Sequence, residues 1–173
     1  MRVGEKMSRT NLILIGMPAS GKSTVGVVLA KVIGFDFIDT DILIQRAEKK
    51  RLPQIIHDVG VEGFLEVENR VNASVEAEHS VIATGGSAVY GEEAMRHFKE
   101  IGHIFYLKVD YDTLCRRLKN IRQRGVALRE GQTLRDLYEE RSLLYEKYAD
   151  TVIEEHGDAE DVVVDILKRI EKG

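Results

Sequence analysis

A glycine-rich octapeptide near the start of the chain carries the strongest chemical signal. Gly16 to Ser23 read Gly-Met-Pro-Ala-Ser-Gly-Lys-Ser and match G-x-x-x-x-G-K-[ST] at every fixed position. Glycines let backbone N–H groups turn inward around phosphate oxygens, and a following helix adds the positive end of its dipole. We therefore predict a phosphate-binding loop in which Lys22 reaches the β- and γ-phosphates and Ser23 offers its hydroxyl to Mg²⁺, rather than a glycine turn that binds nothing. The residues expected to bind the nucleotide here are Gly16, Ala19, Ser20, Gly21, Lys22, Ser23 and Thr24.

Two carboxylates follow the second apolar run of the chain. Asp39 and Asp41 come directly after the expected strand 35–38, at the end of the strand where open α/β sheets place their ligands. Residues two apart share a side of a strand, so one carboxylate would hold the metal while the other orients or deprotonates an attacking hydroxyl. The alternative is that Asp41 or Thr40 only caps a helix beginning at Ile42. The neighbouring phosphate loop favours the catalytic interpretation.

A pair of glycines ends another expected strand. Thr84-Gly85-Gly86-Ser87 follows the apolar run Val81-Ile82-Ala83, and the turn would lie at the same edge of the sheet. Paired glycines at such a place allow a ligand to approach the backbone closely. An ordinary turn between a strand and a helix is the alternative interpretation.

Basic residues are concentrated in one stretch that contains no acidic residue. They are Arg116, Arg117, Lys119, Arg122, Arg124 and Arg129. Phosphoryl transfer needs cations against the charge of the transferring oxygens, and an arginine carried by a closing loop supplies one. Residues 120–132 have no clear period, and we expect a mobile loop or lid there. A solvated charged face and a nucleic-acid patch are alternatives, although no aromatic residue interleaves with these charges.

Short β-type runs alternate with helical patterns along the chain and would position these candidates. Five strands interleaved with helices imply a mostly parallel sheet covered on both faces, an α/β fold of three layers. We expect a helix that begins at Pro53 and stops at Gly60, before a long amphipathic stretch that carries Phe64. The expected strands are 11–15, 35–38, 81–83, 104–107 and 151–153, and the other expected helices are 22–33, 42–50, one from Asp112 and 159–171.

Length and charge limit the possible functions. With 173 residues, the chain has room for one domain, 1–173, and too few for two well-buried ones. The 25 Lys and Arg against 29 Asp and Glu give a net charge of -4, so we expect no nucleic-acid partner and no membrane partner. We also expect a monomer. The polar start of the chain, Met1 to Thr10, is followed by an apolar run that ends at Ile15, which predicts neither a signal peptide nor a spanning helix.

The chain has one cysteine, Cys115, which cannot form an internal disulfide. A reducing, cytoplasmic setting is therefore the expectation. Cys115 lies between Leu114 and Leu118 in a helical pattern, so we expect a small buried thiol rather than a nucleophile.

Taken together, these motifs resemble the shikimate kinases, within the P-loop enzymes related to nucleoside-monophosphate kinases. The similarity runs from Leu12 to about Ile170. The pieces that fall in the family's order are Gly16 to Thr24 followed by Val25-Gly26, Phe37-Ile38-Asp39-Thr40-Asp41, Ala83-Thr84-Gly85-Gly86, the lid around Arg124, and Glu140-Arg141 leading to Leu144-Tyr145. The combination is specific to the family's fold and less specific to the substrate.

The resemblance implies a fold and a set of roles. It implies a five-stranded parallel sheet in the order 2-3-1-4-5, with ATP on the phosphate loop and the acceptor bound by the helical part at about 42–78. Lys22, Asp41 and Arg124 would be catalytic. By the same resemblance, Ser23 and Asp39 would act near magnesium, Arg117 would lie against adenine, and Asp41, Gly85, Gly86 and Arg141 would bind the substrate, with Arg141 at its carboxylate.

Several positions depart from the family's pattern. The family carries an arginine after the phenylalanine of the long helix, and here Leu65 follows Phe64; an apolar leucine cannot replace a bidentate guanidinium. Arg70 is one and a half turns further along the helix and is a poor substitute. Val61 and Ser87 also stand at family positions of glutamate and glycine, and Arg124 is followed by Gly125 where the family usually has proline.

The sequence therefore predicts an ATP- and Mg²⁺-dependent kinase that phosphorylates a hydroxyl of a small molecule. Shikimate is the leading acceptor because the resemblance covers nearly the whole chain. Since the departures lie mainly on the acceptor side, another polyol, hydroxy acid or nucleoside remains an alternative. A protein that binds nucleotide without transferring phosphate is the alternative from a different class.

Overall fold

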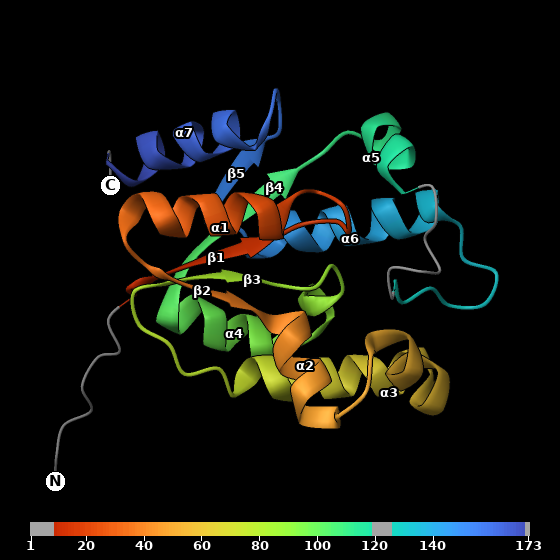
Figure 1. Cartoon of the computed structure of the whole chain (residues 1–173). Helices are drawn as coiled ribbons and strands as arrows, with labels where there is room; N and C mark the ends of the chain where they lie inside the picture. The colour runs from red at the N-terminus through yellow and green to blue at the C-terminus, as the bar shows by residue number, and fades with distance from the viewer. Residues whose placement is uncertain (1–8, 119–125, 172–173) are drawn as a thin grey trace, which may run out of the picture.

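A five-stranded parallel sheet forms the centre of the molecule, with helices on both of its faces (Figure 1). The computed structural model describes residues 9–118 and 126–171. Its strands follow the order β2-β3-β1-β4-β5, so the α/β class and the order that the resemblance implied are both confirmed. The elements are β1 (Asn11–Ile15), α1 (Lys22–Ile33), β2 (Asp36–Asp39), α2 (Thr40–Glu48), α3 (Leu52–Ala73), β3 (Ser80–Ala83), the short 3-10 helix η1 (Ala88–Tyr90), α4 (Glu92–Ile101), β4 (Gly102–Lys108), α5 (Tyr111–Arg117), α6 (Leu134–Tyr148), β5 (Thr151–Glu154) and α7 (Ala159–Ile170).

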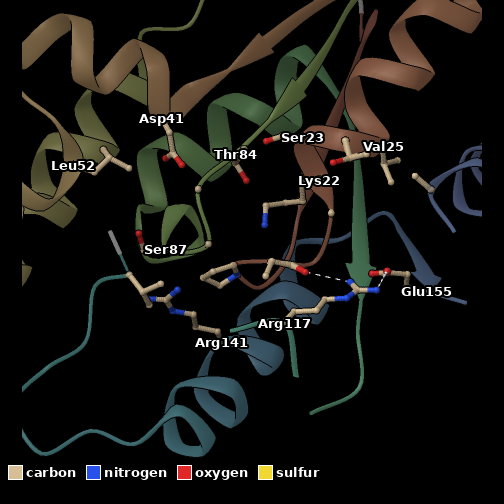
Figure 2. Close-up of a pocket in the computed structure, with 18 of the residues that line it drawn as sticks. Lys22, Ser23, Val25, Asp41, Leu52, Thr84, Ser87, Arg117, Arg141 and Glu155 are labelled. Atoms are coloured by element: carbon tan, nitrogen blue, oxygen red, sulfur yellow. Dashed lines mark hydrogen bonds and ion pairs between the residues drawn. The ribbon is translucent and has the colours of Figure 1, made fainter. Parts of the chain in front are cut away.

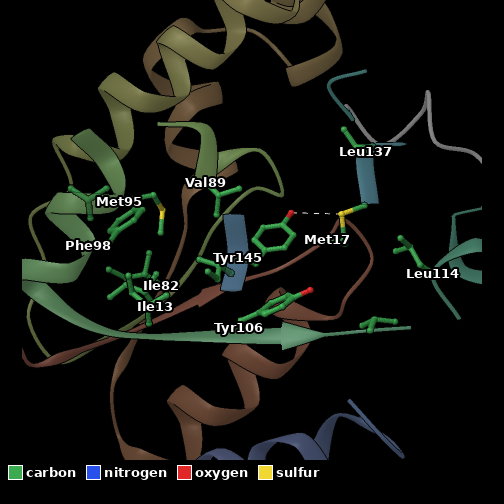
Figure 3. Packing of buried hydrophobic residues seen from close by; sticks show 14 of the residues in the cluster. Ile13, Met17, Ile82, Val89, Met95, Phe98, Tyr106, Leu114, Leu137 and Tyr145 are labelled. Atoms are coloured by element: carbon green, nitrogen blue, oxygen red, sulfur yellow. Dashed lines mark hydrogen bonds between the residues drawn. The ribbon is translucent and has the colours of Figure 1, made fainter. Parts of the chain in front are cut away.

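The central strand β1 is buried on both faces because each face contributes to a different hydrophobic cluster. Ile13 and Ile15 belong to the cluster on the side covered by α4 and α6, together with Phe98 and Tyr145. Figure 3 shows Ile13 beside Ile82 in this cluster. Leu12 and Leu14 point to the opposite side, which α1 and α7 cover. This alternation is what a strand of period two requires when both faces are packed. The continuous apolar run at residues 12–15 is thereby explained.

Helix α3 contains a sharp break at Gly60. This residue has φ 72 and ψ 177, a conformation that is accessible essentially only to glycine, and the helix resumes beyond it. The sequence correctly placed an interruption there, but the helical segments on either side follow one another without a loop. Beyond the break, Phe64 is buried in a third hydrophobic cluster with Ile44, Ile55, Val71 and Ala127. The kink thus brings α3 alongside α2 at the edge where the sheet carries β2.

The sequence reading missed η1, α4 and α6. Helix α4 was recognisable, because Ala94, Met95, Phe98 and Ile101 recur at helical spacing and are all buried. The prediction that Cys115 is buried was wrong. Its thiol is exposed, because α5 is short and turns only Leu114 fully into the core. Within the described residues, no helix is long and apolar enough to cross a membrane.

The packing of α4 on the sheet predicts the effect of truncating its aromatic residue. Phe98 is fully buried, so Phe98→Ala leaves a cavity and is expected to lower the free energy of unfolding by about 3–5 kcal/mol. Leu143→Ala on α6 is the control, because Leu143 is 71% exposed and its truncation is expected to change stability by less than about 0.5 kcal/mol. Urea unfolding measures both. Equal losses for the two variants would contradict this packing.

Candidate active site

A cleft of about 610 Å³ opens where the strands end and their loops begin (Figure 2). Loops that follow β1, β3 and β5 line it, together with residues from α1, α2, α3, α5, α6 and α7 and from the segment before α6. The lining residues are Pro18, Ala19, Gly21, Lys22, Ser23, Thr24, Val25, Asp41, Leu52, Phe64, Thr84, Gly85, Gly86, Ser87, Arg117, Val126, Ala127, Arg141, Glu155, Gly157, Asp158 and Ala159. Each of the four sequence motifs therefore contributes at least one residue to this cavity, although Asp39 of the carboxylate pair is not among its lining residues and the basic stretch contributes Arg117.

The glycine-rich loop leads directly into an uncapped helix. Gly21 is the residue before α1 and has φ 83, a left-handed conformation that glycine adopts without steric cost. No side chain caps the start of α1, and no acidic residue lies in its first turn. The first N–H groups of such a helix are available to an anion, and the helix dipole favours negative charge there. This start of α1 is therefore suited to phosphate.

Lys22 lies folded over the loop, in the centre of the cleft (Figure 2). Its Nζ donates hydrogen bonds to the carbonyl oxygens of Gly16 and Met17, each at 2.8 Å, and to Ser20 Oγ at 3.2 Å. Burial lowers the pKa of this amine to about 8, while the nearby carboxylate of Asp41 acts in the opposite direction. A phosphate oxygen would be a better partner than the loop carbonyls because it carries a full negative charge.

Asp39 joins the loop to the start of α2. Its Oδ2 accepts a hydrogen bond from Ser23 Oγ at 3.0 Å, and its Oδ1 accepts one from the backbone N–H of Asp41 at 3.0 Å. Helix α2 begins at Thr40 and Asp39 is its cap, so the alternative in which Thr40 or Asp41 caps a helix from Ile42 was wrong. Since Asp39 takes the capping role, the carboxylate of Asp41 is left to face the cleft.

The environment of Asp41 differs from that of Asp39. Burial raises the pKa of Asp41 to about 6, and the negative charge of Asp39 adds to this effect, whereas Lys22 opposes it. A carboxylate whose pKa lies closer to neutrality is a better proton acceptor for a hydroxyl group. Of the two carboxylates, Asp41 is therefore the better candidate for a base.

Ser23 and Asp39 form a pair of neighbouring oxygen donors. A hydroxyl and a carboxylate are ligands that suit Mg²⁺, which prefers hard oxygen ligands and keeps several waters. Among the described residues there is no group of three or more His, Cys, Asp or Glu side chains placed to hold a metal ion. The pair fits a magnesium ion that is bound by one or two side chains together with substrate phosphates.

The glycine pair after β3 is required by close approaches from three sides. A Cβ atom on Gly85 would lie 2.7 Å from both Asp41 Oδ1 and Glu68 Oε1, and one on Gly86 would lie 2.6 Å from Pro18 Cδ. The Tyr145 hydroxyl also donates a hydrogen bond to the carbonyl oxygen of Gly86 at 2.5 Å. The backbone of this turn is therefore packed directly against the site.

Two arginines occupy opposite ends of the cleft. Arg117 donates to the Ala19 carbonyl oxygen at 3.2 Å and forms an ion pair with Glu155 at 2.6 Å. Arg141 is 1% exposed and donates to the Ala127 carbonyl oxygen at 3.0 Å. In Figure 2, Arg117 and Glu155 lie on one side of Lys22, and Arg141 lies on the other side with Asp41 and Ser87.

Part of the expected lid falls outside the described residues. Lys119, Arg122 and Arg124 all belong to residues 119–125, so the structure places none of them. The segment that follows is described, and its Val126 and Ala127 line the cleft. Arg129 lies next to this segment and pairs with Glu62 on α3 at 2.7 Å. The described end of the expected lid thus contacts α3 through this exposed ion pair.

Sequence reasoning missed several residues of the site. Glu155, Gly157 and Asp158 follow β5, and the same position after a strand that identified Asp39 and Asp41 would have identified them. Glu68 was missed as well, although the sequence indicated it, because it stands at helical spacing from the apolar residues Phe64 and Val71. In the structure its side chain is 1% exposed. An acidic residue on the buried face of a helix needs an explanation.

The residues that depart from the family's pattern are distributed unevenly around the cleft. Leu65 and Val61 pack against the third hydrophobic cluster, and neither is among the described residues that line the cavity. Ser87 does line it, and its Oγ donates a hydrogen bond of 2.5 Å to Glu68 Oε2. Arg70 pairs with Glu48 at 2.8 Å and is exposed, which confirms that it does not replace the missing arginine.

The fold and the site define a class of protein. A parallel sheet in this order, with a glycine-rich loop between β1 and α1 and carboxylates after β2, is the arrangement of P-loop phosphotransferases. The chain belongs to the shikimate kinase family. The model of that family, described as "Shikimate kinase", matches residues 18–171.

Two similar proteins, one known by sequence and one by structure, agree with this assignment over nearly their whole length. The shikimate kinase of Thermodesulfovibrio yellowstonii is 34% identical, with 94% of this chain and 95% of that protein covered. A solved structure of shikimate kinase from Acinetobacter baumannii, in complex with shikimate, has a TM-score of 0.85 at 31% identity and covers 96% of this chain and 95% of that one. The mouse protein "Threonine synthase-like 1" is 36% identical, but the match spans only 23% of its length.

The crowding around Gly85 predicts a coupled effect of two substitutions. Gly85→Ala introduces a Cβ against Asp41 and Glu68 and is expected to lower the free energy of unfolding by about 1–3 kcal/mol. In a Glu68→Ala background one of the two crowding oxygens is gone, so the same substitution is expected to cost less. A double-mutant cycle in urea measures the difference. Equal costs in the two backgrounds would show that Glu68 does not crowd this position.

Proposed function

We propose that the chain transfers the γ-phosphoryl group of ATP to a hydroxyl of shikimate, in the presence of Mg²⁺, and forms shikimate 3-phosphate and ADP. The observation that carries the proposal is the convergence, in one cleft, of a phosphate loop, the carboxylate of Asp41 and the buried guanidinium of Arg141. Membership of the shikimate kinase family and the shikimate bound to the Acinetobacter baumannii relative support shikimate as the acceptor.

On the nucleotide side, we assign the phosphates to the loop and the start of α1. Lys22 would exchange its loop carbonyls for oxygens of the β- and γ-phosphates, and Arg117 would lie against adenine, oriented by its ion pair with Glu155. Arg124, on the expected lid, would add positive charge to the transferring oxygens. The residues assigned to the nucleotide are Gly16, Ala19, Ser20, Gly21, Lys22, Ser23, Thr24 and Arg117.

We assign magnesium to Ser23 and Asp39, whose oxygens already lie 3.0 Å apart. When bound, Mg²⁺ neutralises charge that develops on the phosphate oxygens during transfer. The residues themselves contribute orientation. Asp39 holds the Ser23 hydroxyl and the first turn of α2 at once, and it thereby fixes Asp41 relative to the loop.

On the acceptor side, Asp41 accepts the proton of the attacking hydroxyl. A bond forms between the hydroxyl oxygen and the γ-phosphorus, and the bond from that phosphorus to the β–γ bridging oxygen breaks, so ADP leaves with the bonding electrons. Arg141 would bind the acceptor carboxylate through a charge-assisted hydrogen bond, while Gly85 and Gly86 present backbone to the ring. The helical part at about 42–78 would complete this half of the site with Leu52 and Phe64.

The setting of the protein stays a prediction. We propose a monomer in a reducing, cytoplasmic environment, with a small hydroxylated acid as its only partner besides nucleotide. The comparisons give no support to the alternative acceptors or to a protein that binds nucleotide without transferring phosphate.

The proposed activity predicts the outcome of an acceptor panel. ADP release is expected with shikimate well above the rate without acceptor, and gluconate, sugars, nucleosides and nucleoside monophosphates are expected to give only that background. A coupled assay for ADP measures all of them. A shikimate rate no higher than background, with another acceptor active, would replace shikimate and keep the kinase; no active acceptor would remove the kinase.

Asp41→Asn is the matched control for this assay. The amide keeps the size and shape of the side chain but cannot accept the proton, so turnover is expected to fall by at least about 100-fold. Affinity for ATP is expected to stay close to that of the unaltered chain, because Asp41 lies on the acceptor side of Lys22 (Figure 2). Unchanged turnover in this variant would contradict the role assigned to Asp41.

A further inference from the structure

Tyr90 is a half-buried aromatic residue of η1 whose ring two arginines approach, and the proposed mechanism gives it no role. The Cζ atom of Arg141 lies over this ring at 5.4 Å from its centroid, and the Cζ atom of Arg129 lies over it at 5.5 Å. At both distances the electron-rich face of an aromatic ring attracts a guanidinium. Tyr90 therefore connects the arginine that we assign to the acceptor with an arginine from the segment before α6.

Arg141 depends on such a neighbour because few contacts fix its guanidinium. The side chain is 1% exposed, and its Nη2 donates a hydrogen bond to the Ala127 carbonyl oxygen at 3.0 Å. Its Nε is buried and has no hydrogen-bond partner among the residues that the structure describes. A guanidinium binds a carboxylate in bidentate fashion only when its planar fork has the correct orientation. The ring of Tyr90 supplies a surface that limits the rotation of this fork.

The ring of Tyr90 is itself held in place by side chains around Glu140. The Tyr90 hydroxyl donates a hydrogen bond of 2.6 Å to Glu140 Oε1. Arg129 Nη1 donates to the same oxygen at 3.2 Å, and Gln132 Nε2 donates to Glu140 Oε2 at 3.4 Å. Burial raises the pKa of Tyr90 and Glu140 adds to the rise, whereas Arg141 opposes it. The hydroxyl therefore stays protonated and remains a donor at neutral pH.

Arg129 connects this cluster to α3 and to the lining of the cleft. Its Nε donates to Glu62 Oε1 at 2.7 Å, so one guanidinium contacts α3, η1 and α6. Two residues before Arg129, Ala127 lines the cleft, and its carbonyl oxygen accepts the hydrogen bond from Arg141. The ring and the carbonyl oxygen that hold Arg141 are therefore both close to Arg129.

From these contacts we infer that Tyr90 is a positioning residue of the acceptor site: the face of its ring orients the guanidinium of Arg141 towards the acceptor carboxylate. Glu140 and Arg129 fix the ring in that place. Tyr90 is not among the described residues that line the cleft, so it acts through Arg141. The inference rests on the proposed function because it assumes an acceptor that carries a carboxylate.

The test compares the kinetics of Tyr90→Leu with those of the unaltered chain. Leucine keeps an apolar side chain at this position but offers no aromatic face to Arg141, so the KM for shikimate is expected to rise roughly five- to twentyfold. The value of kcat should change by less than about threefold and the KM for ATP by less than about twofold, because the phosphate loop and Asp41 are unaltered. Tyr90→Phe keeps the ring and should raise the KM for shikimate less than Tyr90→Leu does.

The methyl ester of shikimate makes the test specific for the carboxylate. The ester offers no negative charge to Arg141, so the orientation of the guanidinium has little effect on its binding. The ratio of kcat/KM between the unaltered chain and Tyr90→Leu should therefore be close to one with the ester and much larger with shikimate. If the ester turns over slowly, its inhibition constants against shikimate in the two proteins give the same comparison. A purely structural role of Tyr90 would affect both compounds alike.

Tyr111→Leu is the matched control for Tyr90→Leu. The Cζ atom of Arg135 lies over the ring of Tyr111 at 4.0 Å, but neither residue is among the described residues that line the cleft. The control therefore removes the same kind of contact at a place without a ligand. Its KM for shikimate should stay within about twofold of that of the unaltered chain.

Arg129→Met tests the second contact of the ring and keeps the inference testable if Tyr90→Leu does not fold. It removes a cation from the ring and the ion pair with Glu62, so the KM for shikimate should rise and the KM for ATP should not. Because both residues act through the same ring, Arg129→Met should have a smaller effect in a Tyr90→Leu background than in the unaltered chain.

The outcomes separate this inference from the proposed function. A rise in the KM for shikimate that occurs in Tyr90→Leu but not in Tyr111→Leu, and that the methyl ester does not show, would support the inference. Equal effects of these two variants, or equal losses of kcat/KM for shikimate and its ester, would overturn the inference alone. No turnover of shikimate by the unaltered chain would overturn the proposed function and the inference with it.

Discussion

The burial of opposite charges at one edge of a parallel sheet is the constraint on which the rest of the site depends. Because hydrophobic clusters pack on both faces of β1, a functional polar side chain can reach a ligand only at the ends of the strands. There Lys22, Asp41, Glu68 and Arg141 lie largely out of water, where electrostatic interactions are stronger and unpaired charges are costly. The pKa shifts of Lys22, Asp41 and Glu68 follow chiefly from this enclosure. Lys22 becomes easier to deprotonate, and the two carboxyls become easier to protonate.

The same constraint gives the two halves of the cleft different characters. On the nucleotide side, an uncapped helix and Lys22 offer positive charge to phosphates. On the acceptor side, Arg141 lies beside the turn of Gly85 and Gly86, where a Cβ atom would meet neighbouring atoms at 2.6–2.7 Å. The described residues that line the cleft carry both signs of charge: Lys22, Arg117 and Arg141 are basic, and Asp41, Glu155 and Asp158 are acidic. Specificity for the acceptor rests on a few side chains around that turn.

Much of the fold followed from the sequence because its signals were local. The strands showed continuous apolar runs, the phosphate loop showed a complete motif, and Gly60 showed the break in α3. Helix α4 was missed although its apolar residues had the right spacing. The prediction that Cys115 is buried was wrong because a helix as short as α5 turns only one residue fully towards the core.

Site residues that directly follow a strand could be predicted from the sequence. Site residues that depend on contacts between distant elements could not. Asp39 and Asp41 were found by their position after a strand. That Asp39 is the residue that caps α2 follows only from the hydrogen bond that the backbone N–H of Asp41 donates to it. The hydrogen bond from Ser87 to Glu68 joins residues 19 positions apart, and no sequence motif predicts it. The most direct test of the account uses ATP that carries a radioactive γ-phosphate, with shikimate and Mg²⁺. We expect the label to be recovered on shikimate; label found only in inorganic phosphate or unreacted ATP would contradict the proposed transfer.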